Sequence, residues 1–168
     1  VIKVAYELEK AGYKTSTTVI GGYTEAYKAK LEQTIKEYRL DNDKVQIIGQ
    51  QPFDKICDAL QKVHFFVFPS QEKMEGHSNS LTEAMTFGVV PVVSTAGFNA
   101  SIVGNKELVV DSIDPMKYAR VIESVIEKNV WSEYSLAVYR RIKENYTEDI
   151  VKKNILCAVD ELEDGENE

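Results

Sequence analysis

The sequence predicts an α/β protein built on a doubly wound, Rossmann-like parallel sheet. Predicted strands alternate with predicted helices over most of the chain, which is the pattern of a sheet covered on both faces. The strands at residues 65–68 and 90–94 are continuous apolar runs without polar alternation, as expected when both faces of a parallel sheet are buried. Ligands bind such sheets at the carboxyl ends of the strands. We therefore expect the polar turns after the strands to gather at one edge.

The first half of the chain shows these elements in order. Apolar residues at helical spacing predict a helix over residues 1–11, and Gly12 ends it. A β-rich strand over residues 15–20 runs into the turn Gly21-Gly22. The next predicted elements are a helix at 24–39, a strand at 45–48 and a helix at 53–61.

The second half continues the alternation and then becomes helical. The predicted elements are a strand at 65–68, a helix at 78–87, a strand at 90–94, a helical turn at 99–103 and a strand at 108–110. From Pro115 onward the pattern is helical, with breaks near Asn129 and at residues 145–147. We assign residues 1–160 to one domain and predict that the acidic residues 161–168 form a frayed or disordered tail.

Composition excludes several classes of function. The 168 residues carry a net charge of −7 without a dense Lys/Arg block, which argues against nucleic acid as the main partner. Cys57 and Cys157 lie 100 residues apart, and the aspartates show no metal-ligand spacing, so we expect reduced thiols and no metal site. No apolar stretch approaches the roughly 18 residues of a membrane span. We expect a cytoplasmic protein. Because the chain starts inside a helix without methionine, we also expect a piece of a longer protein.

Residues 75–85 are the most informative stretch. Two acids, Glu75 and Glu83, lie eight positions apart on either side of a small polar loop that turns into a helix. Gly76 allows a close backbone approach to an anion, and His77 offers a donor for a phosphate or a hydroxyl. The unpaired amides near residues 78–80 favour a diphosphate. Like charges repel, so Glu83 would instead accept hydrogen bonds from sugar hydroxyls.

Each of these interpretations has a structural alternative. Ser78 as a helix cap and Glu83 as a solvated helix residue fit the local pattern equally well. Gly21-Gly22 is either a simple tight turn or part of a phosphate or base pocket. His64, which opens a buried strand, is expected to be structural. No Ser-His-Asp or Cys-His arrangement is present in the sequence pattern, so covalent hydrolase chemistry is not supported.

The motifs together resemble a known family. They are Pro69-Ser70, Glu75-Gly76, Glu83-Ala84-Met85 and Gly88-Val89-Val90-Pro91-Val92-Val93, with Val19-Ile20-Gly21-Gly22-Tyr23 upstream. In this order and spacing, the chain resembles the C-terminal, donor-binding domain of the retaining glycosyltransferases with the GT-B fold, family GT4. The resemblance covers about residues 1–160.

The resemblance implies roles for individual residues. Glu75 would be the catalytic residue that faces the transferred sugar, and Glu83 would hold the ribose. The expected donor nucleotide and diphosphate residues are Gly21, Gly22, Gly76, His77, Ser78, Asn79, Ser80, Leu81 and Glu83. Residues around Gly49 and Gln50 would lie near the base.

The same resemblance implies the reaction. The full protein would transfer a sugar from an NDP-sugar to an acceptor hydroxyl with retention, in polysaccharide or glycan biosynthesis, without a cofactor or a metal. A glycan or lipid-linked acceptor would bind through an N-terminal domain, with peripheral contact at the inner face of the membrane as an alternative location. This fragment alone is expected to be inactive.

Some features depart from the family pattern. A first strand bearing an Arg and a Lys that hold the diphosphate would precede Val1. The segment between Ser70 and Glu75 is about two residues longer than in the family. A Glu that often follows the loop after the Pro-Val-Val strand is absent, and Asn99 or Ser101 stands near its place.

Two rival functions share this architecture. One is a non-catalytic nucleotide-binding or regulatory module, and the other is a sugar-nucleotide epimerase. Sequence upstream of Val1 would discriminate them best, because an Arg and Lys strand after a second α/β domain favours the transferase.

Overall fold

The chain folds into alternating helices and parallel strands, which the computed structural model describes for residues 1–40, 43–71 and 76–165. The elements are α1 (Ile2–Lys10), β1 (Thr17–Ile20), α2 (Glu25–Glu37), β2 (Val45–Ile48), α3 (Phe53–Leu60), β3 (Phe65–Phe68), α4 (Asn79–Thr86), β4 (Val90–Ser94), α5 (Asn99–Val103), the 3₁₀ turn η1 (Lys106–Leu108), β5 (Val109–Val110), α6 (Pro115–Glu127), α7 (Trp131–Asn145) and α8 (Glu148–Gly165). Every strand and helix predicted from the sequence is present, with small shifts at the ends.

The strands pair in parallel, as predicted for a doubly wound α/β fold. β1 pairs with β2, with Thr17 opposite Val45. β4 lies between β3 and β5, with Phe65 opposite Val90. Among the residues that the structure describes, the pairing forms a two-stranded and a three-stranded sheet, and β1 is not hydrogen-bonded to β3.

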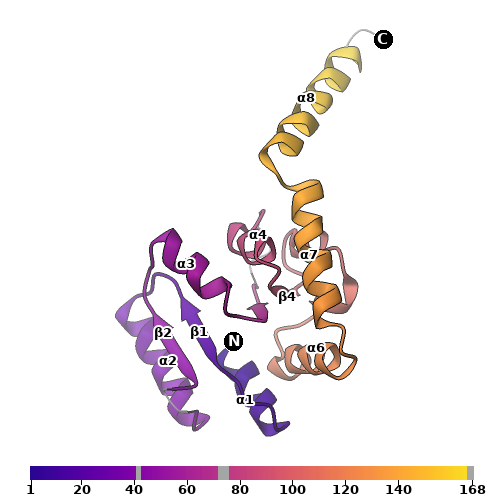
Figure 1. The fold of residues 1–168 in the computed structure, drawn as a ribbon. Coiled ribbons are helices and arrows are strands. Elements are labelled where there is room, and N and C mark those ends of the chain that lie inside the picture. Colours follow the sequence, from indigo (N-terminus) through magenta and orange to yellow (C-terminus); the bar gives the residue numbers. More distant parts are fainter. Residues whose placement is uncertain (41–42, 72–75, 166–168) are drawn as a thin grey trace.

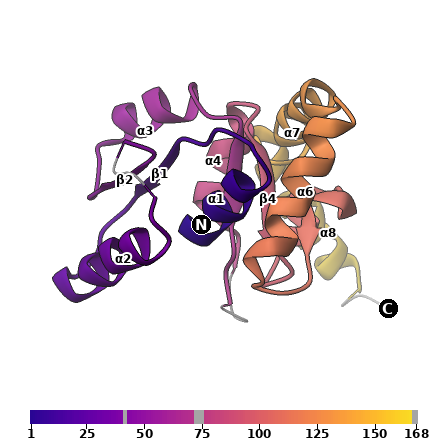
Figure 2. The ribbon, with the colours of Figure 1, turned by 90° about the horizontal axis from the view of Figure 1, so that it is seen from below.

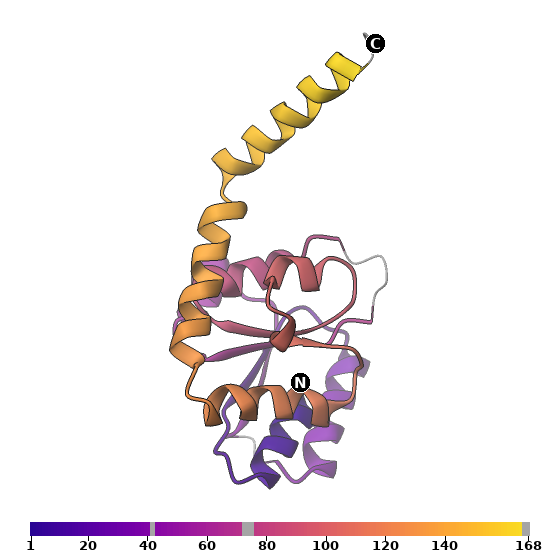
Figure 3. The ribbon, with the colours of Figure 1, turned by 90° about the vertical axis from the view of Figure 1, so that its right-hand side faces the viewer.

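Strand β4 is the centre of the larger sheet, and helices cover both of its faces (Figure 3). All five residues of β4 are buried. Val90 and Val93 belong to the core shared with α4, α5 and α7, whereas Val92 belongs to the core shared with α1 and α6. This division explains the unbroken apolar run, because apolar side chains on both faces remove surface from water.

Helix α1 connects the two parts of the domain. It packs against both α2 and α6, between which it lies in Figure 2. Its residues Val4 and Leu8 join the core beneath β4, while Ile2 joins Ile35 and Val45 beneath the β1–β2 sheet. One amphipathic helix therefore contributes to the cores of both sheets.

The last two helices differ in their packing. Helix α7 packs along α4, whereas α8 projects away from the rest of the molecule (Figure 1). The sequence predicted a frayed tail from residue 161, but the helical backbone continues through residue 165. Acidic residues and Leu are compatible with helix, which accounts for the longer element. In the described ranges, no helix combines the length and apolar character needed to cross a membrane.

Candidate functional site at the carboxyl ends of the strands

The loops at the carboxyl ends of the strands carry most of the residues that the sequence singled out. Residues 21–24 follow β1 and residues 49–52 follow β2, while the loop that leads into α4 follows β3. Within each sheet the strands run in parallel, so these loops lie at the same edge. The expected gathering of polar turns is thus confirmed for each sheet.

The loops after β1 and β2 touch through Tyr23. A Cβ placed on Gly49 would lie 3.6 Å from the Tyr23 hydroxyl oxygen. Gly21 has a φ of +150° and donates its amide to the carbonyl of Ile48 at 3.3 Å, so its backbone belongs to the sheet. Gly22 is exposed, and a Cβ there would meet no atom within 4 Å. The backbone of Gly22, in the loop after β1, is therefore accessible to a ligand.

The start of α4 leaves several amides without an acceptor. Ser78 is the N-cap residue by position, and its carbonyl accepts the amide of Thr82 at 3.2 Å. Its hydroxyl does not cap the helix but lies 3.3 Å from the hydroxyl of Ser80. In the part of the chain that the structure describes, the amides of residues 79–81 therefore have no capping partner. They form the positive end of the helix dipole.

The side chains of α4 divide between the core and the surface. Leu81 is fully buried, so only its amide is available to a ligand. Asn79 and Ser80 are exposed, and Glu83 is half-buried one turn further along the helix. The Glu83 carboxylate has no hydrogen bond or ion pair among the described residues, and its acceptor capacity is unused.

The loop before α4 is described in part. Glu75, the expected catalytic residue, lies outside the described residues, so its predicted role stays a prediction. Gly76 is exposed, and a Cβ there would meet no atom within 4 Å. His77 is also exposed, and its ring centroid lies 5.2 Å from that of Tyr146 at the end of α7. Of the loop residues that the structure describes, His77 therefore has one aromatic contact and Gly76 has open space around it.

A cavity of about 320 Å³ lies at the carboxyl ends of β3, β4 and β5. Its lining consists of Ser70, Gln71, Ser94, Thr95, Ala96, Gly97, Asp111, Ser112 and Ile113. The Ser94 hydroxyl donates to the Ser70 carbonyl at 2.7 Å. Asp111 accepts a hydrogen bond from Lys117 at 2.8 Å, and this contact lowers the pKa of the Asp111 carboxyl. The cavity is therefore lined by several hydroxyl groups, and the Asp111 carboxylate is already paired with Lys117.

Two buried polar groups lie next to this cavity's loops. Asn99 is fully buried, and among the described residues neither atom of its side-chain amide has a hydrogen-bond partner. The Tyr118 hydroxyl is also buried, without a hydrogen bond of normal geometry to any residue that the structure describes. Burial raises the pKa of Tyr118, although the nearby Ser94 hydroxyl offsets part of this effect. Asn99 lies near the position where the resemblance places a Glu, but it points into the protein interior.

The other residues noted in the sequence have structural contacts. The hydroxyl of Ser101 donates to the carbonyl of Phe98 at 2.9 Å. The carbonyl of His64 accepts the indole N–H of Trp131 at 3.0 Å, and the two rings lie 5.2 Å apart. The His64 side chain is exposed and has this ring contact with Trp131, and its expected structural role stays a prediction.

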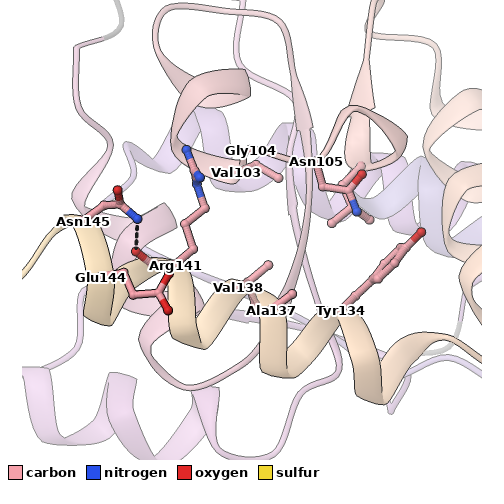
Figure 4. A pocket seen from close by; sticks show the side chains of 10 residues that line it. Val103, Gly104, Asn105, Tyr134, Ala137, Val138, Arg141, Glu144 and Asn145 are labelled. Carbon is pink, nitrogen blue, oxygen red and sulfur yellow. Dashed lines mark hydrogen bonds between the residues drawn. The ribbon is translucent and has the colours of Figure 1, made fainter.

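A second cavity, of about 260 Å³, lies between α5 and α7 (Figure 4). Its lining consists of Val103, Gly104, Asn105, Leu108, Tyr134, Ala137, Val138, Arg141, Glu144 and Asn145. The side chain of Arg141 extends from α7 toward the end of α5, where its donors are used by backbone carbonyls. This cavity lies away from the carboxyl ends of the strands, and no sequence pattern predicted it.

A comparison with known protein families gives a match over most of the chain. The sequence profile of the family described as "Glycosyl transferases group 1" matches residues 1–149. No curated protein matches the sequence significantly.

Three solved structures share the fold. A glycosyltransferase from Rickettsia africae has a TM-score of 0.77 at 14% identity, covering 93% of this chain and 43% of its own. A sucrose-phosphate synthase from Thermosynechococcus elongatus has a TM-score of 0.78 at 19% identity, covering 98% and 42%. The catalytic domain of a cholesterol-α-glucosyltransferase from Helicobacter pylori has a TM-score of 0.61 at 12% identity, covering 83% and 87%. The chain thus spans less than half the length of the first two.

Proposed function

Because the chain belongs to the group 1 glycosyl transferase family, we propose that it is the donor-binding domain of an enzyme that transfers a sugar from a nucleoside-diphosphate sugar to an acceptor hydroxyl. The start of α4 carries this proposal. There, backbone amides that have no capping partner among the described residues lie at the carboxyl end of a parallel sheet, one turn before Glu83, whose carboxylate has no ion pair within the same ranges. Such a helix start is suited to a diphosphate.

The reaction needs stabilisation of negative charge on the departing diphosphate. The amides of residues 79–81 and the positive end of α4 supply it without reorganisation during the reaction. Glu83 would repel a phosphate, so we assign it to neutral hydroxyls of the ribose. Gly22, whose backbone is open, would line the donor cleft together with Gly76 and His77.

The finer parts of the proposal come from the family resemblance. They are retention at the anomeric carbon, a glycan or lipid-linked acceptor bound by the rest of the protein, a role in polysaccharide or glycan biosynthesis, and catalysis without a cofactor or metal in the cytoplasm or at the inner membrane face. Glu75 would face the transferred sugar. The open edges of β1 and β3 are compatible with a further strand from the rest of the protein. We therefore propose that the chain alone binds a nucleotide but does not transfer the sugar.

Calorimetric binding of UDP-, GDP- and ADP-sugars to the full-length protein tests the proposal. One of these donors should bind, and Glu83→Ala should weaken its binding by roughly 1.5 to 3 kcal/mol for each hydrogen bond lost to the carboxylate. Glu133→Ala is the matched control, because Glu133 is an exposed helix glutamate on α7. Unchanged donor affinity in Glu83→Ala would remove Glu83 from the site, and no binding of any sugar nucleotide would contradict the proposed function.

A further inference from the structure

The guanidinium group of Arg141 donates hydrogen bonds to the backbone carbonyls at the carboxyl end of α5. Its Nε donates to the carbonyl of Ile102 at 2.7 Å, and its Nη2 donates to the carbonyl of Ser101 at 2.6 Å. These carbonyls belong to the last turn of a helix, where no amide of the same helix can reach them. Hydrogen bonds from a charged donor are stronger than neutral ones. Arg141, which lies on α7, therefore acts as the cap of a different helix (Figure 4).

Gly104 makes this contact possible. It follows α5 in the left-handed conformation, with a φ of +69°, and donates its amide to the carbonyl of Ala100 at 2.9 Å. A Cβ on Gly104 would lie 2.4 Å from Cζ of Arg141 and 2.6 Å from its Nε. Any other residue would force the guanidinium away, so Gly104 and Arg141 form one unit.

Helix α5 needs this support because it has only five residues. Short helices are unstable alone and depend on tertiary contacts. The amino end of α5 follows directly on the loop after β4, and the carbonyl of Phe98 accepts the amide of Ile102 at 2.9 Å. Residues 94–97 of this region supply four of the nine residues that line the cavity at the carboxyl ends of β3, β4 and β5. The position of α5 thus sets one wall of that cavity.

From this geometry we infer that Arg141 is a positioning residue for sugar transfer. Arg141 fixes α5, α5 fixes the loop of residues 94–98, and this loop lines the cavity at the carboxyl ends of β3, β4 and β5. The effect on catalysis rests on the proposed function, whereas the effect on the loop does not. The proposed nucleotide contacts come from the loop after β1 and from α4, which make no hydrogen bond with Arg141. Loss of the guanidinium should therefore slow transfer without weakening nucleotide binding.

The test compares Arg141→Gln with Arg140→Gln in the full-length protein. Arg140 is the neighbouring exposed arginine of α7, and among the described residues it has no hydrogen bond or ion pair. Arg141→Gln should speed hydrogen exchange of the amides of residues 95–104 and lower kcat about 10- to 100-fold, because small misplacements at a site cost this much. Its Kd for a nucleoside diphosphate should stay within about twofold of the wild type. Arg140→Gln should match the wild type, and Arg141→Lys should restore part of kcat.

Several outcomes would overturn the inference. Unchanged exchange over residues 95–104 in Arg141→Gln would mean that Arg141 does not hold the loop. Faster hydrogen exchange with an unchanged kcat would mean that the conformation of the loop does not affect sugar transfer. A parallel loss of nucleotide affinity and kcat, with faster exchange throughout β3–β5, would show a general structural role. If the wild type binds no sugar nucleotide, the proposed function fails, and the exchange experiment still decides whether Arg141 holds α5.

Discussion

The rings of His77 and Tyr146 lie 5.2 Å apart, centroid to centroid, and are tilted by 51°. His77 belongs to the loop that leads into α4, and Tyr146 stands between α7 and α8. Through His77, the loop next to the proposed diphosphate site therefore packs against the residue that connects α7 to α8. A change in the position of the Tyr146 ring can therefore alter the position of His77 beside the site.

Removing the Tyr146 ring should weaken nucleotide binding. In Tyr146→Leu the apolar packing of this partly buried residue is kept while the ring contact is lost. Aromatic pairs contribute about 0.5–1.5 kcal/mol, so we expect roughly two- to tenfold weaker binding of the nucleoside diphosphate by calorimetry. Tyr139→Leu is the control, because Tyr139 is an exposed tyrosine of the same helix near Lys143. Equal effects of the two variants would contradict a role for the His77 contact.

Gly88 at the end of α4 should tolerate no side chain. It has a φ of +70°, and a Cβ there would lie 2.8 Å from the Ser135 hydroxyl oxygen on α7. Gly88→Ala should lower the free energy of unfolding by about 1–2 kcal/mol for the left-handed backbone alone, and by more because of the contact. Urea unfolding measures the loss. Adding Ser135→Ala should recover only the steric part. Full recovery in the double variant would mean that the backbone conformation costs nothing.

The order of elements was predictable from the sequence because local patterns encode it. The apolar runs at residues 65–68 and 90–94 needed burial on both faces, and the structure gives β4 that burial between α4, α7 and α6. Gly12 was a reliable helix end, since its φ of +93° suits glycine. The position of Ser78 before α4 was also correct, but its hydroxyl bonds Ser80 instead of capping the helix.

The rest of the site depends on contacts between distant residues. The strand at residues 108–110 was predicted, but no local pattern showed that Asp111, which follows β5, lines the cavity at the carboxyl ends of β3, β4 and β5. Arg141 reaches α5 across about forty positions of sequence, which no local pattern reveals. The burial of Asn99 likewise results from packing and not from its own residue type, since Asn is usually exposed.

Gly22→Ala should separate ligand binding from stability. A Cβ at Gly22 meets no protein atom within 4 Å, and its backbone needs no left-handed conformation. We therefore expect a change in unfolding free energy within about 0.5 kcal/mol. If the donor lies against this backbone, the same methyl group should weaken nucleotide binding measurably. If Gly22→Ala binds the nucleotide with wild-type affinity, the donor does not lie against Gly22. This conclusion would hold even if Glu83 binds the donor.

The Glu9 carboxylate links α1 to the strand β2. It accepts a hydrogen bond from Lys44 Nζ at 2.7 Å and another from the Thr15 hydroxyl at 3.0 Å. The hydrogen bond from Lys44 is the main cause that lowers the pKa of Glu9, and Thr15 adds to it. A carboxyl whose pKa is lower in the folded state stabilises the fold above its unfolded pKa of about 4.3. This contribution is lost as the pH falls through the folded value.

Glu9→Gln should consequently lower stability at pH 7 and matter less in acid. The side chains of Glu9 and Lys44 are 20% and 41% exposed, so solvent screening limits the expected loss to about 1 kcal/mol in urea unfolding. As the pH falls below about 4, protonation of the wild-type carboxyl removes the same interaction, and the two unfolding free energies should converge. Glu7→Gln is the control, because Glu7 pairs with Lys10 of the same helix, α1, at 3.1 Å. A difference between wild type and Glu9→Gln that stays constant from pH 7 to pH 3 would show that the charge of Glu9 is not what stabilises the contact.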